Sequence, residues 1–437
     1  MSVPDAGVVP APISPAEVAT GEPLEADAST SPKRGGWFIF VTTFAMFASM
    51  LAALMPALYS LAVRTQAVDP GGKEASLGLV VAVGSAVSIF SGPMVGRLSD
   101  ASRSRLGRRR PFLVAGIVVV SVGYVIIALA PSVPVILLGW VIALIGMGCV
   151  SVAFQTIIVE HIPEAQRGKV GALGGVATQL AGVAATLLGA LLTSHTLALL
   201  LAPSVVLVVA AVLYWFTVPE SFGTADAKIG SLREVFTAMV FNPRTYPDFG
   251  WVWIGKFFIQ FGVAFFSTYQ IYFLLDRLGF TAQEAGAKIA LIGGIGIIIT
   301  SGGAVLSGWL SDRFRRRKAF IYLAGAFFAV GLSTIAFAQN FTAYAVGGLL
   351  VLAGSGVFGA VDLALATDVM PKGGTEAGRF MNVYGMSASL ANAVAPAVAP
   401  AVLLVGGAGG NYTALYVTAA VLALGGTILV FPIRSVR

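Results

Sequence analysis

The sequence predicts an all-α membrane protein whose twelve transmembrane helices form two pseudo-symmetric six-helix bundles. Of its 437 residues, 57% are hydrophobic and 11% are charged, whereas a soluble protein carries about 25% charged residues. The charged residues gather between apolar runs of about 20 residues, the length at which a helix crosses ~30 Å of hydrocarbon. Lipid cannot hydrogen-bond an open strand edge, so we expect each run to be a helix.

The apolar runs fall into two groups of six. An N-terminal bundle is expected over residues 37–217 and a C-terminal bundle over residues 249–437, joined by a cytoplasmic linker at residues 218–248. Residues 1–36 are expected to be a disordered tail, because the first 32 positions contain five acids and neither lysine nor arginine. The twelve runs are 37–62, 76–97, 111–130, 134–158, 170–193, 197–217, 249–275, 285–310, 319–338, 342–367, 379–404 and 413–432.

The placement of lysine and arginine predicts the orientation in the membrane. Twenty-two of these residues lie in segments on one side of the predicted spans, and Lys256 lies inside a span. Cytoplasmic loops carry the excess of positive charge, so the basic side is expected to be cytoplasmic, with both termini inside the cell and the protein in the plasma membrane. The 4 basic residues of the opposite side are Arg64, Lys73, Arg277 and Lys288.

A short basic hinge occurs once in each half of the chain. Residues 92–111 contain six arginines and Asp100, and residues 303–318 contain a weaker copy with Asp312. The two aspartates are 212 positions apart, about half the length of the chain. This spacing indicates two related halves, each with one such hinge.

Two further landmarks repeat at an offset of 208 positions. A Gly-Met-Gly triplet at 146–148 recurs as Gly-Ser-Gly at 354–356, and Glu160 recurs as Asp368. Internal repeats of this kind are typical of secondary transporters, which bind their solute between the repeats near the middle of the membrane.

Residues 37–432 resemble the major facilitator superfamily. Within it, the hinge residues 99–111 are similar to the glycoside–pentoside–hexuronide cation symporters, closest to the sucrose-transporter branch and its bacterial relatives. Residues 256–272 and 360–368 are also similar to those bacterial relatives. The resemblance implies alternating access, coupling to a cation and a central cavity lined by the seventh and tenth helices.

The sequence departs from that branch at two places. The family often has arginine after the hinge aspartate, where this chain has Ala101. The sucrose branch also has an arginine late in its fourth helix, where this chain has Gln155, although Glu160 keeps the carboxylate that follows it. The change to glutamine removes a cation from the pair that the branch uses for coupling.

Asp362 and Glu160 are the candidate proton-coupling residues. Asp362 lies nine residues before Pro371, or about 13 Å inside the tenth run. A carboxylate at that depth costs at least ~2.5 kcal/mol, which makes it a functional candidate. The alternative is a structural partner for a nearby cation. Glu160 has the alternative role of a partner for the hinge arginines.

Candidate substrate-binding residues follow from a polar stripe in the seventh run. Lys256, Gln260, Ser267 and Gln270 share one helix face, and a polar face inside lipid must look into protein or water. We expect Lys256 to meet Asp362, either to bind the solute or as a permanent salt bridge. The other candidates are Tyr269, which has the alternative role of a membrane-interface anchor, and Gln155 and Asn382.

The hinges predict a cytoplasmic gate that is closed in one state of the transporter and broken in the other. The alternative is that their basic residues only hold these loops on the cytoplasmic side. The candidate gate residues are Asp100, Arg105, Arg108 and Arg109 in the first half, and Asp312, Arg316 and Asp368 in the second.

The sequence contains no nucleotide loop, zinc-ligand spacing or serine-nucleophile elbow. We therefore expect a monomeric transporter that is not an enzyme and uses a proton gradient instead of a cofactor or metal. Its net charge of +7 lies in short loops, which does not fit nucleic-acid binding. The expected function is proton-coupled uptake of a sugar or glycoside. The alternatives are proton-coupled export of a hydrophobic or sugar-like compound, and a non-transporting membrane receptor.

Overall fold

The structure is a computed structural model that describes residues 33–100, 104, 107, 109–219, 241–370, 374–406 and 410–433. Over these residues the secondary structure is helical, with no strand. The predictions for the N-terminal tail and for most of the linker lie outside the described residues.

The twelve predicted apolar runs each coincide with a helix of the structure. Eleven helical spans are long and apolar enough to cross a membrane within the part of the chain that is described, and α14 is apolar but shorter. The all-helical prediction is therefore confirmed. The N-terminal half contains α1 (Gly36–Met55), the π-helical segment η1 (Pro56–Ser60), α2 (Leu61–Val68), α3 (Lys73–Asp100), α4 (Arg110–Leu129), α5 (Val133–His161), α6 (Glu164–Leu192) and α7 (Thr196–Thr217). The C-terminal half contains α9 (Pro247–Tyr272), the π-helical segment η2 (Phe273–Arg277), α10 (Ala282–Phe314), α11 (Arg317–Ala336), α12 (Phe341–Val369), α13 (Gly374–Leu403) and α14 (Tyr412–Ile428).

Glycines let α4 cross α5, and α11 cross α12, at backbone contact. A Cβ atom added to Gly123 would lie 2.6 Å from the carbonyl oxygen of Gly139, and one added to Gly331 would lie 2.8 Å from that of Gly347. Side chains at these positions would force the helices apart. The second pair lies 208 positions after the first, so the repeat seen in the sequence is a repeat of helix crossings.

The Gly-x-Gly triplets of the repeat have the same structural role in both halves. A Cβ atom at Gly146 of α5 would lie 2.7 Å from the carbonyl oxygen of Gly116 in α4, and one at Gly354 of α12 would lie 3.1 Å from that of Ala324 in α11. The first glycine of each triplet thus places the fourth helix of a half directly against the third.

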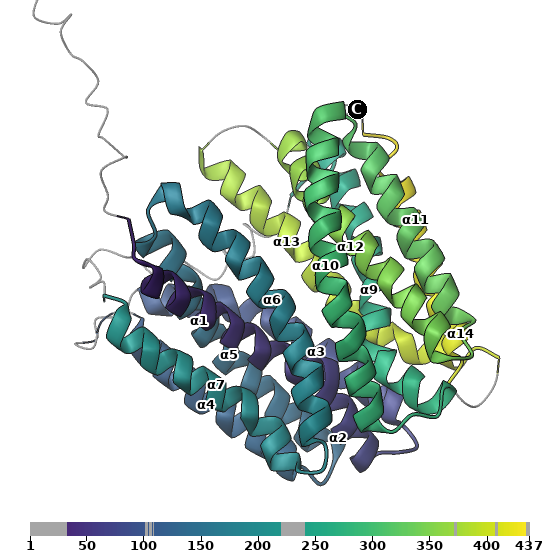
Figure 1. The fold of residues 1–437 in the computed structure, drawn as a ribbon, viewed down its shortest axis with the longest axis horizontal. Helices are drawn as coiled ribbons and strands as arrows, with labels where there is room; N and C mark the ends of the chain where they lie inside the picture. The colour runs from purple at the N-terminus through teal and green to yellow at the C-terminus, as the bar shows by residue number, and fades with distance from the viewer. Residues whose placement is uncertain are drawn as a thin grey trace, which may run out of the picture.

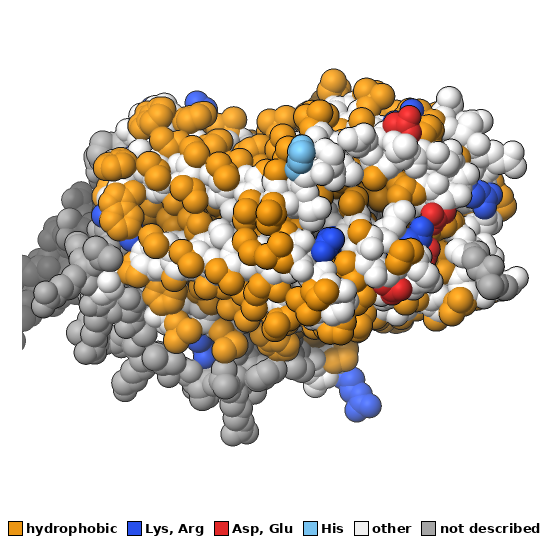
Figure 2. Space-filling model, turned by 90° about the horizontal axis from the view of Figure 1, so that it is seen from below, with side chains coloured by type: hydrophobic (Ala, Val, Ile, Leu, Met, Phe, Trp, Pro, Cys, Tyr) orange, Lys and Arg blue, Asp and Glu red, His pale blue; other side chains and the backbone are white. Residues whose placement is uncertain are grey.

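The outer surface carries the hydrophobic side chains that a lipid environment requires. On α4, Val114, Val118 and Val122 are about half exposed, and Phe216 of α7 is 85% exposed. Figure 2 shows a face on which hydrophobic side chains cover much of the described surface while charged ones are few. A soluble protein rarely exposes so large an apolar area.

The two bundles lie side by side and make their main helix-to-helix contacts through α3 with α13 and α6 with α10 (Figure 1). We call the end of the molecule that carries residues 109–110 and 312–318 the basic end, and the opposite end, with residues 59–78, the far end. The ribbons of the two halves converge near α2 at the far end and diverge toward the basic end (Figure 1).

Candidate functional site

A buried cluster of three polar side chains lies within the C-terminal bundle. Lys256 of α9 and Asp362 of α12 form a salt bridge with 3.1 Å between Nζ and Oδ2, and Asp362 is only 5% exposed. The predicted meeting of these two residues is confirmed. Tyr384 of α13, which the sequence did not single out, donates its hydroxyl hydrogen to the same carboxylate oxygen. The ammonium of Lys256 also lies 3.5 Å from the centre of the Tyr384 ring.

Packing contacts next to the cluster position its side chains. Trp253, one turn before Lys256, donates its indole N–H to the carbonyl oxygen of Val383 at 2.8 Å. That bond fixes α13 against α9 directly beside Tyr384. Asp362 follows Ala360 and Val361 in α12, and Val361 is buried in the apolar cluster that also contains Tyr384.

The cluster can respond to a proton. The ionised carboxylate of Asp362 receives a charge-assisted hydrogen bond from Tyr384 and the ammonium charge of Lys256. If Asp362 takes up a proton, Lys256 loses its counter-charge but keeps the face of the Tyr384 ring, which attracts a cation. Protonation of Asp362 would therefore remove the counter-charge of Lys256 and leave its contact with the Tyr384 ring.

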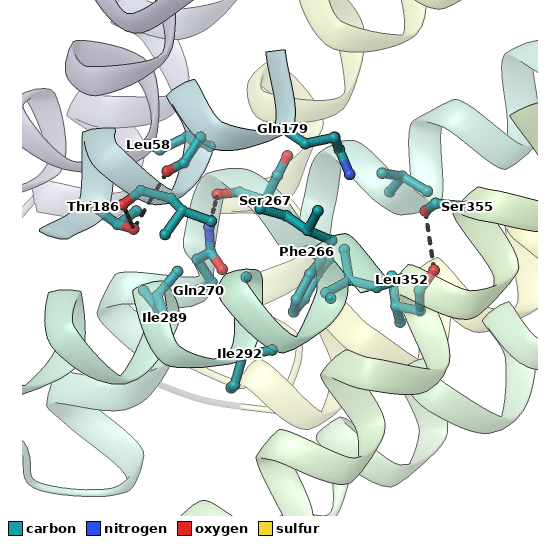
Figure 3. Close-up of a pocket in the computed structure, with 17 residues that line it drawn as sticks. Leu58, Gln179, Thr186, Phe266, Ser267, Gln270, Ile289, Ile292, Leu352 and Ser355 are labelled. Atoms are coloured by element: carbon teal, nitrogen blue, oxygen red, sulfur yellow. Dashed lines mark hydrogen bonds between the residues drawn. The ribbon is translucent and has the colours of Figure 1, made fainter. Parts of the chain in front are cut away.

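A cavity of about 220 Å³ lies between the bundles. It is lined by α6 of the N-terminal half and by α9, α10 and α12 of the C-terminal half, together with Leu58 of η1. Its polar lining residues are Gln179, Thr186, Ser267, Gln270 and Ser355. Figure 3 shows Thr186, Gln179 and Ser267 on one side of the view and Ile289 and Ile292 on the other, with Phe266 between them.

The cavity receives part of the predicted stripe of α9. Ser267 and Gln270 line it, whereas Gln260 is half-buried and outside it. Lys256 also lies outside it and binds Asp362 instead. The stripe is therefore divided between a solute-sized space and the charged cluster nearer the basic end.

Three other predicted substrate residues are not in the cavity. Gln155 and Asn382 are exposed and do not belong to its lining. Tyr269 is buried at the contact between the bundles, where its single hydroxyl hydrogen is within hydrogen-bond reach of the carbonyl oxygens of Glu74, at 3.2 Å, and Pro396, at 3.1 Å. These bonds make Tyr269 part of the far-end contact in this conformation. The sequence did not predict the lining residues Gln179, Thr186 and Ser355, because each is a single polar residue in an apolar run and forms no polar stripe.

At the basic end of the N-terminal bundle, Arg109 joins two helices. It donates to Glu160 of α5 at 2.8 Å and to Ser99 of α3 at 2.9 Å. Glu160 is thus a partner of a hinge arginine, the second of the two roles that the sequence allowed. Arg110 donates to the carbonyl oxygen of Trp215 at 2.9 Å, near the end of α7. The predicted gate residues Arg105 and Arg108, and the side chain of Asp100, lie outside the described part of the chain.

The basic end of the C-terminal bundle repeats this arrangement, with Arg317 in place of the predicted Arg316. Arg317 forms a salt bridge with Asp368 at 2.5 Å and approaches Asp312 at 3.9 Å. Arg316 is exposed and precedes the first residue of α11. Arg317 lies 208 positions after Arg109, and the same offset relates Asp368 to Glu160. This offset could have identified Arg317 as the second gate arginine from the sequence.

A network of hydrogen bonds joins the two bundles at the far end. Thr65 and Tyr272 share a hydrogen bond of 2.6 Å between their hydroxyls, and Lys73 forms a salt bridge with Asp276 at 2.6 Å. Tyr59 donates to the carbonyl oxygen of Ala282 at 2.8 Å. By contrast, the described ion pairs of Arg109 and Arg317 each connect helices of one bundle.

Two six-helix halves with repeated helix crossings, an apolar outer surface and a cavity between them that contains polar side chains are typical of a membrane transporter. The chain belongs to the Major Facilitator Superfamily, whose family model matches residues 36–396, with a second match over residues 288–437. The expected superfamily membership is therefore confirmed.

Individual relatives are similar over part of the chain. The cis,cis-muconate transport protein of Acinetobacter baylyi is 27% identical over 42% of this chain and 45% of its own length. The inner membrane transport protein YajR of Escherichia coli K12 is 30% identical over 40% of this chain and 37% of its own length. The matched stretch thus spans less than half the length of these relatives.

Solved structures are similar over nearly the whole chain. A D-xylose–proton symporter has a TM-score of 0.68 at 18% identity, covering 91% of this chain and 98% of its own. An inward-facing, occupied bacterial homologue of the lysosomal transporter Spinster has a TM-score of 0.69 at 14% identity, covering 90% and 95%. At these identities the likeness shows the fold alone.

Proposed function

We propose that this transporter takes up a sugar or glycoside together with protons across the plasma membrane, by alternating access between its two bundles. The observation that carries the proposal is the buried Lys256–Asp362 pair with Tyr384, because a carboxylate inside a membrane protein is costly and is the group through which a proton is commonly coupled to transport. The similarity of the hinge to cation symporters of sugars supports the solute class, and a proton-coupled sugar symporter shares the fold.

The contacts between the bundles support an assignment of the conformational state. Hydrogen bonds such as Thr65–Tyr272 and the Lys73–Asp276 salt bridge join the far ends, while the ribbons diverge at the basic end. With the basic end cytoplasmic, as the excess of lysine and arginine favours, this is the inward-facing state. Opening to the other side then requires the far-end bonds to break and the basic ends to meet.

In this mechanism Asp362 carries the proton. With the far end open, a proton binds the carboxylate and frees Lys256 from its ion pair. After the bundles rock, the proton leaves to the cytoplasm, and the attraction of Lys256 reforms the pair. The solute in the cavity and the proton on Asp362 are coupled because the bundles reorient readily only when both sites are loaded or both are empty.

The test is transport by the Asp362→Asn variant in proteoliposomes. Asparagine keeps the shape of the side chain but cannot gain or lose a proton, so accumulation of a labelled pyranoside under an imposed pH gradient is expected to disappear. Exchange of labelled for unlabelled solute without a gradient is expected to persist. Glu164→Gln, at an exposed position in the first turn of α6, is the control and is expected to accumulate solute normally. Full gradient-driven accumulation by Asp362→Asn would remove this residue from the mechanism.

A further inference from the structure

We infer that the cavity between the bundles takes an uncharged solute that donates hydrogen bonds along one edge and presents one apolar face, held between Gln179 of α6 and Gln270 of α9. The inference rests on the proposed function, because it takes this cavity as the solute site. It then uses the chemistry of the lining residues to narrow the class of solute.

The hydroxyl groups of the lining are set up to accept hydrogen bonds. Ser355 donates its single hydroxyl hydrogen to the carbonyl oxygen of Val351 at 2.9 Å, and Thr186 donates to that of Val183 at 3.1 Å. Ser267 donates to the carbonyl oxygen of its own helix three residues earlier, at 3.3 Å. A hydroxyl has one hydrogen and two lone pairs, so these three groups have only acceptor capacity left for a solute.

The two amides of the lining belong to different bundles. Gln270 donates one Nε2 hydrogen to the carbonyl oxygen of Ser267 at 3.2 Å, which leaves its Oε1 as an acceptor and its second Nε2 hydrogen as a donor. Gln179 belongs to the other bundle and offers both a donor and an acceptor. A solute that engages both amides therefore connects the bundles, and most of its partners require it to supply hydrogens, as the hydroxyl groups of a carbohydrate do.

Charge and shape narrow the class further. None of the described residues that line the cavity is charged. A carboxylate there would lose its water without gaining a counter-ion, which is far more costly than burying a neutral hydroxyl that finds a partner. Ile289, Ile292 and Phe266 belong to the apolar part of the lining, so the matching face of the solute is hydrocarbon, such as an aglycone or the axial C–H face of a pyranose ring.

Matched sets of ligands test each part of this class on purified full-length protein by isothermal titration. For glucosides, galactosides and xylosides, the methyl pyranoside is the parent. Its fully O-methylated form removes the donors, and the phenyl pyranoside enlarges the apolar face. For the two hexosides, the uronide replaces CH₂OH by a carboxylate. We expect the uronide and the O-methylated form to bind about tenfold or more weakly than the parent, since a tenfold increase in Kd corresponds to a loss of about 1.4 kcal/mol of binding free energy. The phenyl form is expected to bind more tightly than the parent.

Substitutions locate the site. Gln179→Leu is expected to weaken binding of the preferred pyranoside about tenfold, whereas Thr178→Val changes it little. Thr178 is the neighbouring residue, outside the lining, whose hydroxyl bonds to the carbonyl oxygen of Gly174. Equal or tighter binding of the uronides, binding insensitive to Gln179→Leu, or no binding by any neutral pyranoside would each overturn the inference. Failure of Asp362→Asn to uncouple transport would contradict the proton mechanism alone and leave the ligand preferences unchanged.

Discussion

Asp362 shows how a residue that stands out in the sequence acquires its partners only in the fold. Its depth in an apolar run marked it as functional, and Lys256 was expected as its cation. Tyr384 could not be identified, because a tyrosine in an apolar helix is common and its orientation depends on how α13 packs. The indole–carbonyl bond between Trp253 and Val383 sets that packing, and it is a contact between residues 130 positions apart.

The first prediction concerns the two contacts of Tyr384. Replacement by phenylalanine removes the hydrogen bond to Asp362 but keeps the ring under Lys256, and is expected to cost about 1.5–3 kcal/mol of stability. Replacement by leucine also removes the ring and is expected to cost about 2 kcal/mol more, because the cation is desolvated. Thermal unfolding of the purified variants measures both values. Equal losses for the two variants would show that the ring does not stabilise the ammonium.

The second prediction concerns the ion pair itself. Lys256→Met leaves the Asp362 carboxylate buried without its counter-charge and is expected to cost about 3–5 kcal/mol. The double variant Lys256→Met/Asp362→Asn removes both charges and is expected to recover most of that loss. A double-mutant cycle of unfolding temperatures provides the measurement, and strictly additive losses would contradict a direct interaction between the two residues.

At the scale of helices, the sequence predicted which segments are helical but not where they end. The spans were read from apolar residues, so α6 was expected to begin at residue 170, whereas it begins at Glu164. A helix does not need to stop at the membrane surface, because its backbone hydrogen bonds are satisfied in water as well. The offset of 208 was more informative, since it related Gly123 and Gly139 to Gly331 and Gly347 as repeated crossings and Arg109 to Arg317 as repeated ion-pair partners.

The third prediction tests these crossings. Gly331→Ala places a Cβ atom 2.8 Å from the backbone of Gly347, so it is expected to destabilise the protein by about 1–3 kcal/mol through overpacking. Gly359→Ala is the matched control in α12, where an added Cβ meets no atom within 4 Å. There the higher helix propensity of alanine is expected to stabilise by up to about 1 kcal/mol. Unfolding temperatures that change in the same direction for both variants would argue against backbone contact at Gly331.

At the scale of the whole molecule, the halves and their repeat were visible in the sequence, but the conformational state was not. The residues that join the far ends belong to six different segments, which are η1, α2 and α3 of one half and α9, η2 and α10 of the other. Tyr59 lies in η1 and Asp276 in η2. Their contacts exist only because the bundles are tilted toward each other at this end, which is a property of rigid-body orientation and leaves no pattern in the chain.

The fourth prediction tests the far-end contact as the element that closes the cavity to one side. Tyr272→Phe removes the hydrogen bonds to Thr65 and to the carbonyl oxygen of Ala62. Each bond is worth about 1 kcal/mol, so the ratio of far-end-open to far-end-closed molecules is expected to rise at least about fivefold.

Cysteine labelling measures this ratio. Leu58→Cys, in a protein whose native Cys149 is replaced by alanine, places a thiol at the cavity. A membrane-impermeant maleimide applied to the far-end side is expected to label it faster when Tyr272→Phe is present. Thr334→Val is the control, because the hydroxyl of Thr334 in α11 donates to the carbonyl oxygen of Val330 in its own helix. An unchanged labelling rate in the Tyr272→Phe protein would mean that this contact does not hold the far end closed.

The sequence by itself determined the twelve helices, their division into two related halves and the placement of the basic residues, because each is a one-dimensional property of length, hydropathy or spacing. Only the tertiary structure decided which polar side chains meet: Tyr384 with Asp362, Arg317 with Asp368, and Gln179 across the cavity from Gln270. The physical reason is that a helix in lipid can turn any of its faces inward. The face it buries is fixed by packing against helices far away in the chain.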